Sequence, residues 1–172
     1  MRQWKPDPNA AKPFVPARAR IVEAAWGLFR FGGIRAVRIS MIAEQANTNI
    51  ETVVKYFSRE ELINNYVRQL AKDDEWTWGN LKNEIPGNAA GQLRNWLEMQ
   101  GTNATDRMGC ALSNVAIELI HKRSNPAREV IREQKEVRLG HIARLCREAG
   151  YREPELLANK LNLLIEGRTC PR

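Results

Sequence analysis

The sequence predicts an all-α protein, and three observations support this. Apolar residues recur at three- and four-residue spacing through most of the chain after residue 17. No segment of useful length alternates apolar and polar residues as a strand does. Glycine, asparagine and proline separate the periodic segments, as expected for loops between helices. At 172 residues, the chain is long enough to bury one sizeable core.

The chain is expected to open with a flexible basic arm and one helix. Residues 1–17 contain four of the eight prolines and no periodic apolar pattern. Helical periodicity begins at residue 18 and continues to Gly32 and Gly33, which supply a C-terminal stop. This first helix starts a small domain that we place at residues 18–58.

Two short helices follow the first one. Their apolar patterns cover residues 39–46 and 50–57, and the four-residue turn between them, Ala46 to Asn49, begins at the last residue of the first pattern. Two short helices joined by such a turn make a helix-turn-helix unit. Asn47 stands where this turn needs a left-handed backbone, which asparagine tolerates. Asn49 is a good N-cap for the second short helix.

The remaining helices form a second domain, which we place at residues 59–172. A helix over residues 58–76 opens with Ser58 followed by Glu61, the pattern of a capping box. A loop at residues 83–91 ends this helical stretch. Further helices are predicted over residues 91–100, 110–122, 126–150 and 154–167.

Charge is concentrated in the first third of the chain. Residues 1–59 contain ten Lys or Arg and four acidic residues, a difference of +6, whereas the rest of the chain carries 17 basic and 16 acidic residues, a difference of +1. The net charge of +7 favours an anionic partner, although a modest positive balance can also serve solubility. The basic first third is therefore expected to face that partner.

The second short helix has a face suited to DNA. Val53 and Phe57 are four residues apart and are expected to point inward, which leaves Thr52, Lys55 and Tyr56 on the opposite face. A helix in the major groove needs short donors that reach base edges and longer donors that reach phosphates. Thr52 fits the first role, and Lys55 and Tyr56 fit the second. The alternative is an ordinary solvated face, but the concentrated charge favours DNA.

The segment from Arg20 to Leu62 resembles the DNA-binding domain of the TetR family of transcriptional regulators. The residues that carry the resemblance are "IVEAAWGLFRFGGIRAVRISMIAEQANTNIETVVKYFSREEL", which contains the "IA..A" helix, the turn and the opening of helix four. The resemblance implies a repressor that a small-molecule effector releases from a palindromic operator, and a homodimer. It implies DNA-facing positions for Thr48, Asn49, Thr52, Lys55 and Tyr56, and a phosphate contact for Arg59.

Four residues depart from the family pattern. Arg38 stands where Ser or Thr usually caps the second helix, and it brings a charge that can reach phosphate. Asn47 replaces the usual Gly, and Val54 replaces a usual Tyr. Glu51 replaces a small residue; it either accepts from a cytosine amino group or favours the helix dipole. We also expect the helix that usually follows the "LLIEG" segment, half of a four-helix dimer interface, to be absent, because the sequence ends at "RTCPR".

An effector pocket, if present, is expected in the second domain. Trp76, Trp78, Trp96 and Cys110 are the candidate lining residues, because aromatic side chains favour apolar ligands and cations. The alternative for the tryptophans is core packing, and for Cys110 either a redox-sensing thiol or a bystander. The three cysteines are odd in number and widely spaced, which fits reduced thiols.

Other classes of protein find little support in the sequence. No apolar run approaches the roughly 18 residues of a membrane span, and the N-terminus lacks the apolar centre of a secretion signal, so we expect a cytoplasmic protein. No His and Cys spacing predicts a metal site, and no motif predicts a cofactor or a catalytic group. The alternative function is a helical protein-interaction module that has kept the fold without operator binding.

Overall fold

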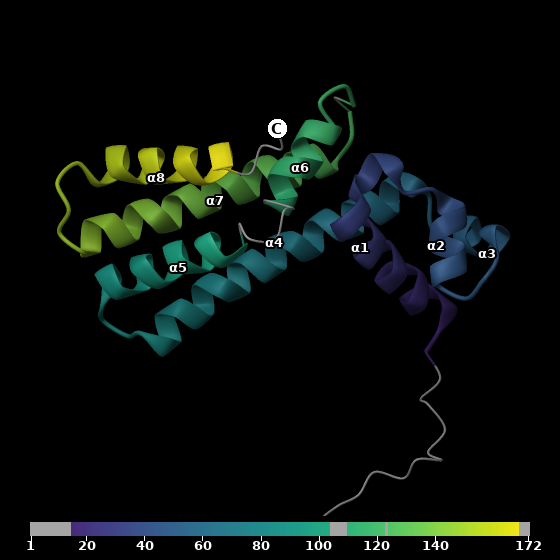
Figure 1. Ribbon diagram of the computed structural model, residues 1–172, viewed down its shortest axis with the longest axis horizontal. Helices are drawn as coiled ribbons and strands as arrows, with labels where there is room; N and C mark the ends of the chain where they lie inside the picture. The colour runs from purple at the N-terminus through teal and green to yellow at the C-terminus, as the bar shows by residue number, and fades with distance from the viewer. Residues whose placement is uncertain (1–14, 104–109, 123, 169–172) are drawn as a thin grey trace, which may run out of the picture.

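The computed structural model describes residues 15–103, 110–122 and 124–168 (Figure 1). Within these ranges the chain forms eight helices and no strand, which confirms the predicted all-α class. The helices are α1 (Ala17–Ala36), α2 (Ile39–Gln45), α3 (Ile50–Tyr56), α4 (Arg59–Glu84), α5 (Ala89–Asn103), α6 (Ala111–Glu118), α7 (Ala127–Glu148) and α8 (Pro154–Arg168).

Three helix ends differ from the sequence prediction. The predicted stop after the first helix is a kink, because Gly33 has φ 74° and ψ 161° and the chain then resumes a helical path to Ala36. Helix α4 extends eight residues beyond the predicted end at residue 76, because Trp78 and Leu81 continue its buried stripe. Helix α6 is shorter than predicted and ends at Glu118.

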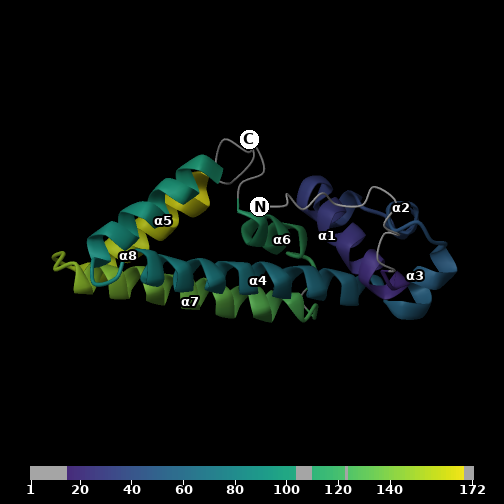
Figure 2. The same ribbon diagram turned by 90° about the horizontal axis from the view of Figure 1, so that it is seen from below.

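Two hydrophobic clusters form the core. The first joins α1, α2, α3, α6 and the start of α7, and the second joins α5, α7 and α8. Helix α4 belongs to both, because Leu62 and Val67 lie in the first cluster whereas Trp78 and Leu81 lie in the second. Figure 2 shows α4 as a long helix with α1 to α3 at one end and α5 and α8 at the other. One continuous helix thus connects the two ends of the molecule.

Aromatic contacts fix α4 against α1 where the two helices meet. Tyr66 of α4 is 3% exposed, and its ring lies 5.6 Å from that of Phe29 and 6.4 Å from that of Trp26, measured between ring centroids. Such aromatic pairs contribute about 0.5–1.5 kcal/mol each beyond their area of burial. A displacement of α4 at this point would therefore carry α1 with it.

None of the helices in the described ranges has the length and apolar character that a membrane crossing requires.

Candidate nucleic-acid interface

The turn between α2 and α3 has the conformation that the sequence predicts. Asn47 has a positive φ of 49°, in the left-handed region. The turn is closed by two backbone hydrogen bonds, from the N–H of Asn47 to the oxygen of Glu44 (3.0 Å) and from the N–H of Thr48 to the oxygen of Ala43 (2.9 Å). Ala43 is 3% exposed, and such a small side chain permits close packing of α2 on its neighbours.

Helix α3 starts with a side-chain cap. The Asn49 carboxamide oxygen accepts a hydrogen bond from the N–H of Thr52 at 2.7 Å, which confirms the predicted N-cap. The cap uses the oxygen of the Asn49 carboxamide and not its nitrogen. Helix α4 starts in the same way, since Ser58 and Glu61 form the predicted capping box. Both helix starts are thus fixed by local sequence.

One face of α3 is buried and the other is open. Val53 is 0% exposed and Phe57 is 4% exposed, and both pack in the first cluster as predicted. The opposite face presents Glu51, Val54, Lys55 and Tyr56, all exposed, with Thr52 half-buried beside them. Ile50, at the first position of α3, is also half exposed, at 50%. The three residues that the sequence places on this face therefore share it with Val54, whereas Ile50 stands three residues before Val53, on the side of the buried stripe.

Arg20 binds the backbone of the turn, a contact that no local sequence pattern predicts. Its Nε donates to the carbonyl oxygen of Ala46 at 3.0 Å, and its Nη2 lies 3.4 Å from the carbonyl oxygen of Asn47. The same side chain donates from Nη1 to the oxygen of Val15 at 2.9 Å. These partners are up to 27 residues away in sequence, so no local pattern signals the contact.

The two arginines that sequence analysis assigned to phosphate contacts differ in their surroundings. Arg38 precedes α2 and is exposed. Arg59 is half-buried, and its guanidinium donates to the carbonyl oxygens of Ile34 and Val37 just beyond the kink in α1. Two of the Arg59 nitrogens are therefore engaged within the chain, and the contact fixes the first turn of α4 to the end of α1.

A hydrogen bond connects this end of α1 to α6. The Glu118 carboxylate, at the last residue of α6, accepts from the backbone N–H of Arg35 at 2.6 Å. Gly33 makes the approach possible, since a Cβ at this position would lie 2.8 Å from the Glu118 Oε1 atom. The second half of the chain thus contacts the end of α1 at a specific atom.

The candidate effector-pocket residues fall into different surroundings. Trp78 and Trp96 are 5% and 1% exposed and stack with their ring centroids 5.1 Å apart, as core packing would require. Trp76 is 69% exposed, and Cys110 packs against the first cluster rather than the second. The structure therefore does not bring the four side chains together.

A cavity lies elsewhere, between α1 and α4. Its volume is about 610 Å³, and Val22, Trp26, Leu62 and Tyr66 give it apolar walls. Exposed charged side chains also line it, namely Arg18, Glu23, Arg68, Lys72 and Asp73. No local sequence pattern signals this cavity, because its walls come from helices about forty residues apart whose side chains otherwise look like ordinary core and surface. Among the described residues, no group of three or more His, Cys, Asp or Glu could hold a metal ion.

Comparison with known proteins identifies the fold. No protein-family model matches the sequence, and no curated protein matches it. Among solved structures, a protein from Streptomyces avermitilis described as a TetR transcriptional regulator matches with a TM-score of 0.73 and 21% identity, over 90% of this chain and 85% of that chain. A TetR-family transcriptional regulator from Streptomyces coelicolor matches with a TM-score of 0.69 and 21% identity, over 89% and 94% of the two chains. A ketosteroid transcriptional regulator from Mycobacterium tuberculosis matches with a TM-score of 0.65 and 13% identity, over 94% and 85%.

Proposed function

We propose that this chain, which has the fold of TetR-family transcriptional regulators, is a sequence-specific DNA-binding repressor that a small-molecule effector releases from a palindromic operator. The observation that carries the proposal is the open face of α3. Thr52, Lys55 and Tyr56 lie together on a helix whose opposite face is buried through Val53 and Phe57. This face lies in the part of the chain that holds nearly all of its net positive charge.

Each exposed side chain of α3 has a role in this proposal. Thr52 is near the N-terminus of the helix and reaches base edges, whereas Lys55 and Tyr56 reach phosphates on either side of the major groove. Ile50 and Val54, which sequence analysis did not assign, supply apolar contacts of the kind that thymine methyl groups offer. Thr48 and the Asn49 carboxamide nitrogen lie at the start of the helix and complete the surface.

Charged residues around α3 position the DNA backbone. Arg38 is exposed beside α2 and contacts phosphate. Glu51 lies in the first turn of α3, where its negative charge interacts favourably with the helix dipole. If Glu51 contacts a base, it accepts a hydrogen bond from a cytosine amino group. Arg59 contributes mainly by holding α4 to the end of α1, because two of its nitrogens already donate to carbonyl oxygens.

The release step follows from the position of α4. A palindromic site fixes the distance between the two recognition helices of a dimer, so a change in that distance lowers affinity. Helix α4 packs in both core clusters, and its first turn is bound to the end of α1 through Arg59. A displacement of its far end by an effector would therefore move the helix-turn-helix unit.

Helix α8 offers the surface for a homodimer. Leu156, Leu163 and Leu164 are 45%, 68% and 64% exposed, and their spacing of seven and eight residues places them on one face of the helix. Val137 of α7 adds a further exposed apolar side chain, at 47%. A second copy of this chain would cover these residues and place two α3 helices for the two halves of a palindrome.

Selection of binding sites from a random duplex pool at physiological salt tests the function. Sequencing of the retained duplexes should show an enriched palindrome. If the protein retains no duplex with salt-dependent affinity, the regulator hypothesis is wrong and the protein-interaction module is favoured, because such a module is not expected to bind duplex DNA.

Variants of the α3 face test the assigned roles on the selected duplex. Lys55→Ala should weaken binding to every sequence and reduce the slope of log affinity against log salt by about one, whereas Thr52→Ala should relax the sequence preference. Lys82→Ala in the last turn of α4 is the matched control, because this lysine is also exposed but lies at the end of α4 that is remote from α3. Equal losses on selected and random duplexes for both α3 variants would contradict the roles.

A further inference from the structure

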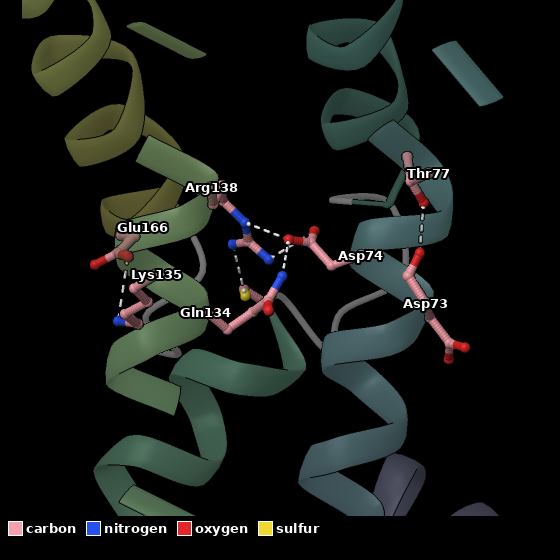
Figure 3. A network of polar contacts seen from close by, with 8 residues as sticks. Asp73, Asp74, Thr77, Gln134, Lys135, Arg138 and Glu166 are labelled. Carbon is pink, nitrogen blue, oxygen red and sulfur yellow. Dashed lines mark hydrogen bonds and ion pairs between the residues drawn. The ribbon is translucent and has the colours of Figure 1, made fainter. Parts of the chain in front are cut away.

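A buried ion pair joins α4 to α7 in the second half of the chain. The Arg138 side chain is 8% exposed, and its guanidinium lies against the Asp74 carboxylate, with Nη2 3.0 Å from Oδ1 and Nε 3.3 Å from Oδ2 (Figure 3). The Gln134 carboxamide nitrogen donates to the same carboxylate at 2.9 Å. One edge of the guanidinium is therefore occupied by Asp74.

The remaining nitrogen of Arg138 faces a thiol. Nη1 lies 3.6 Å from the Sγ atom of Cys110, the residue that precedes α6. A neutral thiol is a weak acceptor, whereas a thiolate satisfies a buried cationic donor. Burial raises the pKa of the Cys110 thiol, but the charge and hydrogen bond of Arg138, together with the nearby Ser113, lower it further than burial raises it. The net pKa lies below that of an ordinary cysteine.

An unused donor lies beside the same sulfur. Ser113 is 7% exposed, and its hydroxyl has no oxygen or nitrogen partner among the described residues. A buried hydroxyl without a partner costs free energy, so an oxygen atom attached to the sulfur would stabilise it. Arg138 Nη1 and the Ser113 hydroxyl together form a pair of donors around Cys110.

We propose that Cys110 is a redox-reactive thiol that small hydroperoxides oxidise to a sulfenic acid, which Arg138 and Ser113 hold. The thiolate attacks the terminal oxygen of the hydroperoxide, so that an S–O bond forms while the O–O bond breaks. The sulfur loses two electrons, and the peroxide is reduced to an alkoxide or hydroxide that takes a proton from water. The oxygen left on the sulfur accepts hydrogen bonds from Arg138 Nη1 and from the Ser113 hydroxyl.

Cys146 provides an internal control for this chemistry. It is 0% exposed and packs in the second hydrophobic cluster. Burial, and after it the charge of Glu155, raise the pKa of its thiol, so that at a given pH a smaller fraction of it is thiolate than of Cys110. The two cysteines thus differ in both access and ionisation.

Oxidation of Cys110 is expected to change the affinity for DNA. This consequence rests on the proposed function, whereas the oxidation itself does not. The Cys110 cluster joins α4 through Asp74, α7 through Arg138 and the start of α6. The far end of α6 holds the backbone of Arg35 through Glu118. A new oxygen on the sulfur draws Arg138 Nη1 toward itself and so changes the contacts of α4 and α6 in this cluster. Both helices also contact the end of α1, which leads into the helix-turn-helix unit, α4 through Arg59 and α6 through Glu118.

Sulfenic-acid trapping tests the site in the full chain carrying Cys170→Ser, which leaves only the two cysteines to be compared. The protein is exposed to hydrogen peroxide with dimedone present, and the cysteine peptides are quantified by mass spectrometry. The expected result is a dimedone adduct on Cys110 and little or none on Cys146. The adduct should be absent from the Cys110→Ser variant. An unmodified Cys110, or equal labelling of both cysteines, would overturn the proposal.

Two variants test how the site works. Asp74→Asn with Arg138→Gln removes the cation without leaving a buried charge unpaired, and it should slow adduct formation; Ser113→Ala should lower the trapped yield while the ion pair stays intact. Unchanged labelling in both variants would contradict the assigned donors. If the double variant does not fold, Ser113→Ala and the comparison of the two cysteines still decide the matter.

Affinity for the selected duplex, measured before and after peroxide, tests the consequence. Peroxide should change the affinity of the parent and leave that of Cys110→Ser unchanged. If the parent binds duplex equally well when oxidised, the regulatory consequence is wrong. If the chain binds no duplex at all, the proposed function fails, and the dimedone adduct still decides the oxidation.

Discussion

The contact between Gly33 and Glu118 leads to a prediction that depends on atomic detail. Gly33 has φ 74° and ψ 161°, a backbone region that is essentially restricted to glycine. Its missing side chain also leaves room for the Glu118 carboxylate, which binds the N–H of Arg35 at 2.6 Å. We therefore expect Gly33→Ala to destabilise the protein both through its backbone and through this carboxylate.

The size of the effect can be worked from these two parts. A residue with a side chain in this backbone region costs about 1–3 kcal/mol. The new Cβ would lie 2.8 Å from Glu118 Oε1, so the carboxylate must move, and a displaced hydrogen bond to a charged group costs up to about 1.5–3 kcal/mol. The sum is about 2.5–6 kcal/mol. At about 2–4 °C per kcal/mol for a chain of this length, the melting temperature should fall by roughly 5–24 °C.

Urea unfolding of four proteins separates the two parts. Glu118→Ala alone should cost only the hydrogen bond, and Gly33→Ala added to Glu118→Ala should cost only the backbone strain, so the two single costs should sum to more than that of the double variant. Gly79→Ala is the control, because Gly79 is exposed within α4 with no atom near its Cβ position, and alanine there should stabilise by about 0.5–1 kcal/mol. Additivity within about 0.5 kcal/mol would refute the contact, and a loss below that value for Gly33→Ala would refute the strain.

Three further predictions concern other parts of the molecule. Asp74→Ala should cost about 3–5 kcal/mol in urea unfolding, because it leaves Arg138 buried without its partner, whereas Asp74→Leu/Arg138→Met should cost much less; equal losses would contradict a buried ion pair. Asn47→Gly should change the unfolding free energy by less than about 1 kcal/mol and Asn47→Val should cost about 1–2 kcal/mol more, because only the valine resists a positive φ; equal stabilities would argue against the left-handed turn. Burial, and after it Arg144, hold the pKa of His141 below its ordinary value of 6.5, so the unfolded chain binds the proton more readily, and stability that is fully present above that pH should be lost as the pH falls. His141→Gln should reduce this loss in melting temperature between about pH 7.5 and 5, and an unchanged pH dependence would contradict it.

Local sequence determined most of the helix-turn-helix unit. The N-caps at Asn49 and Ser58 and the left-handed residue at Asn47 each depend on interactions within a few residues, so their side-chain chemistry is sufficient to predict them. The burial of Val53 and Phe57 follows from helical spacing in the same way. The roles of the exposed α3 residues toward DNA remain predictions, since they depend on a partner.

Distant contacts could not be predicted in this way. Arg20 binds the turn across 26 residues, and Arg138 meets Asp74 and Cys110 across 64 and 28 residues. From sequence alone, a basic residue on a helix is expected to be solvated or to bind phosphate, because its neighbours in the folded protein are not known. The candidate pocket residues illustrate the same limit, because Trp76 is exposed while Trp78, two positions later, is buried.

The sequence by itself thus determined the helical class, the helix-turn-helix unit and its open face, because hydrophobic periodicity, capping and turn chemistry act over a few residues. Only the tertiary structure decided that Glu118 contacts the end of α1, that α4 packs in both clusters and that Cys110 lies against a buried arginine. These features arise when side chains far apart in sequence are packed together and desolvated, and their energies come from that packing rather than from any local pattern.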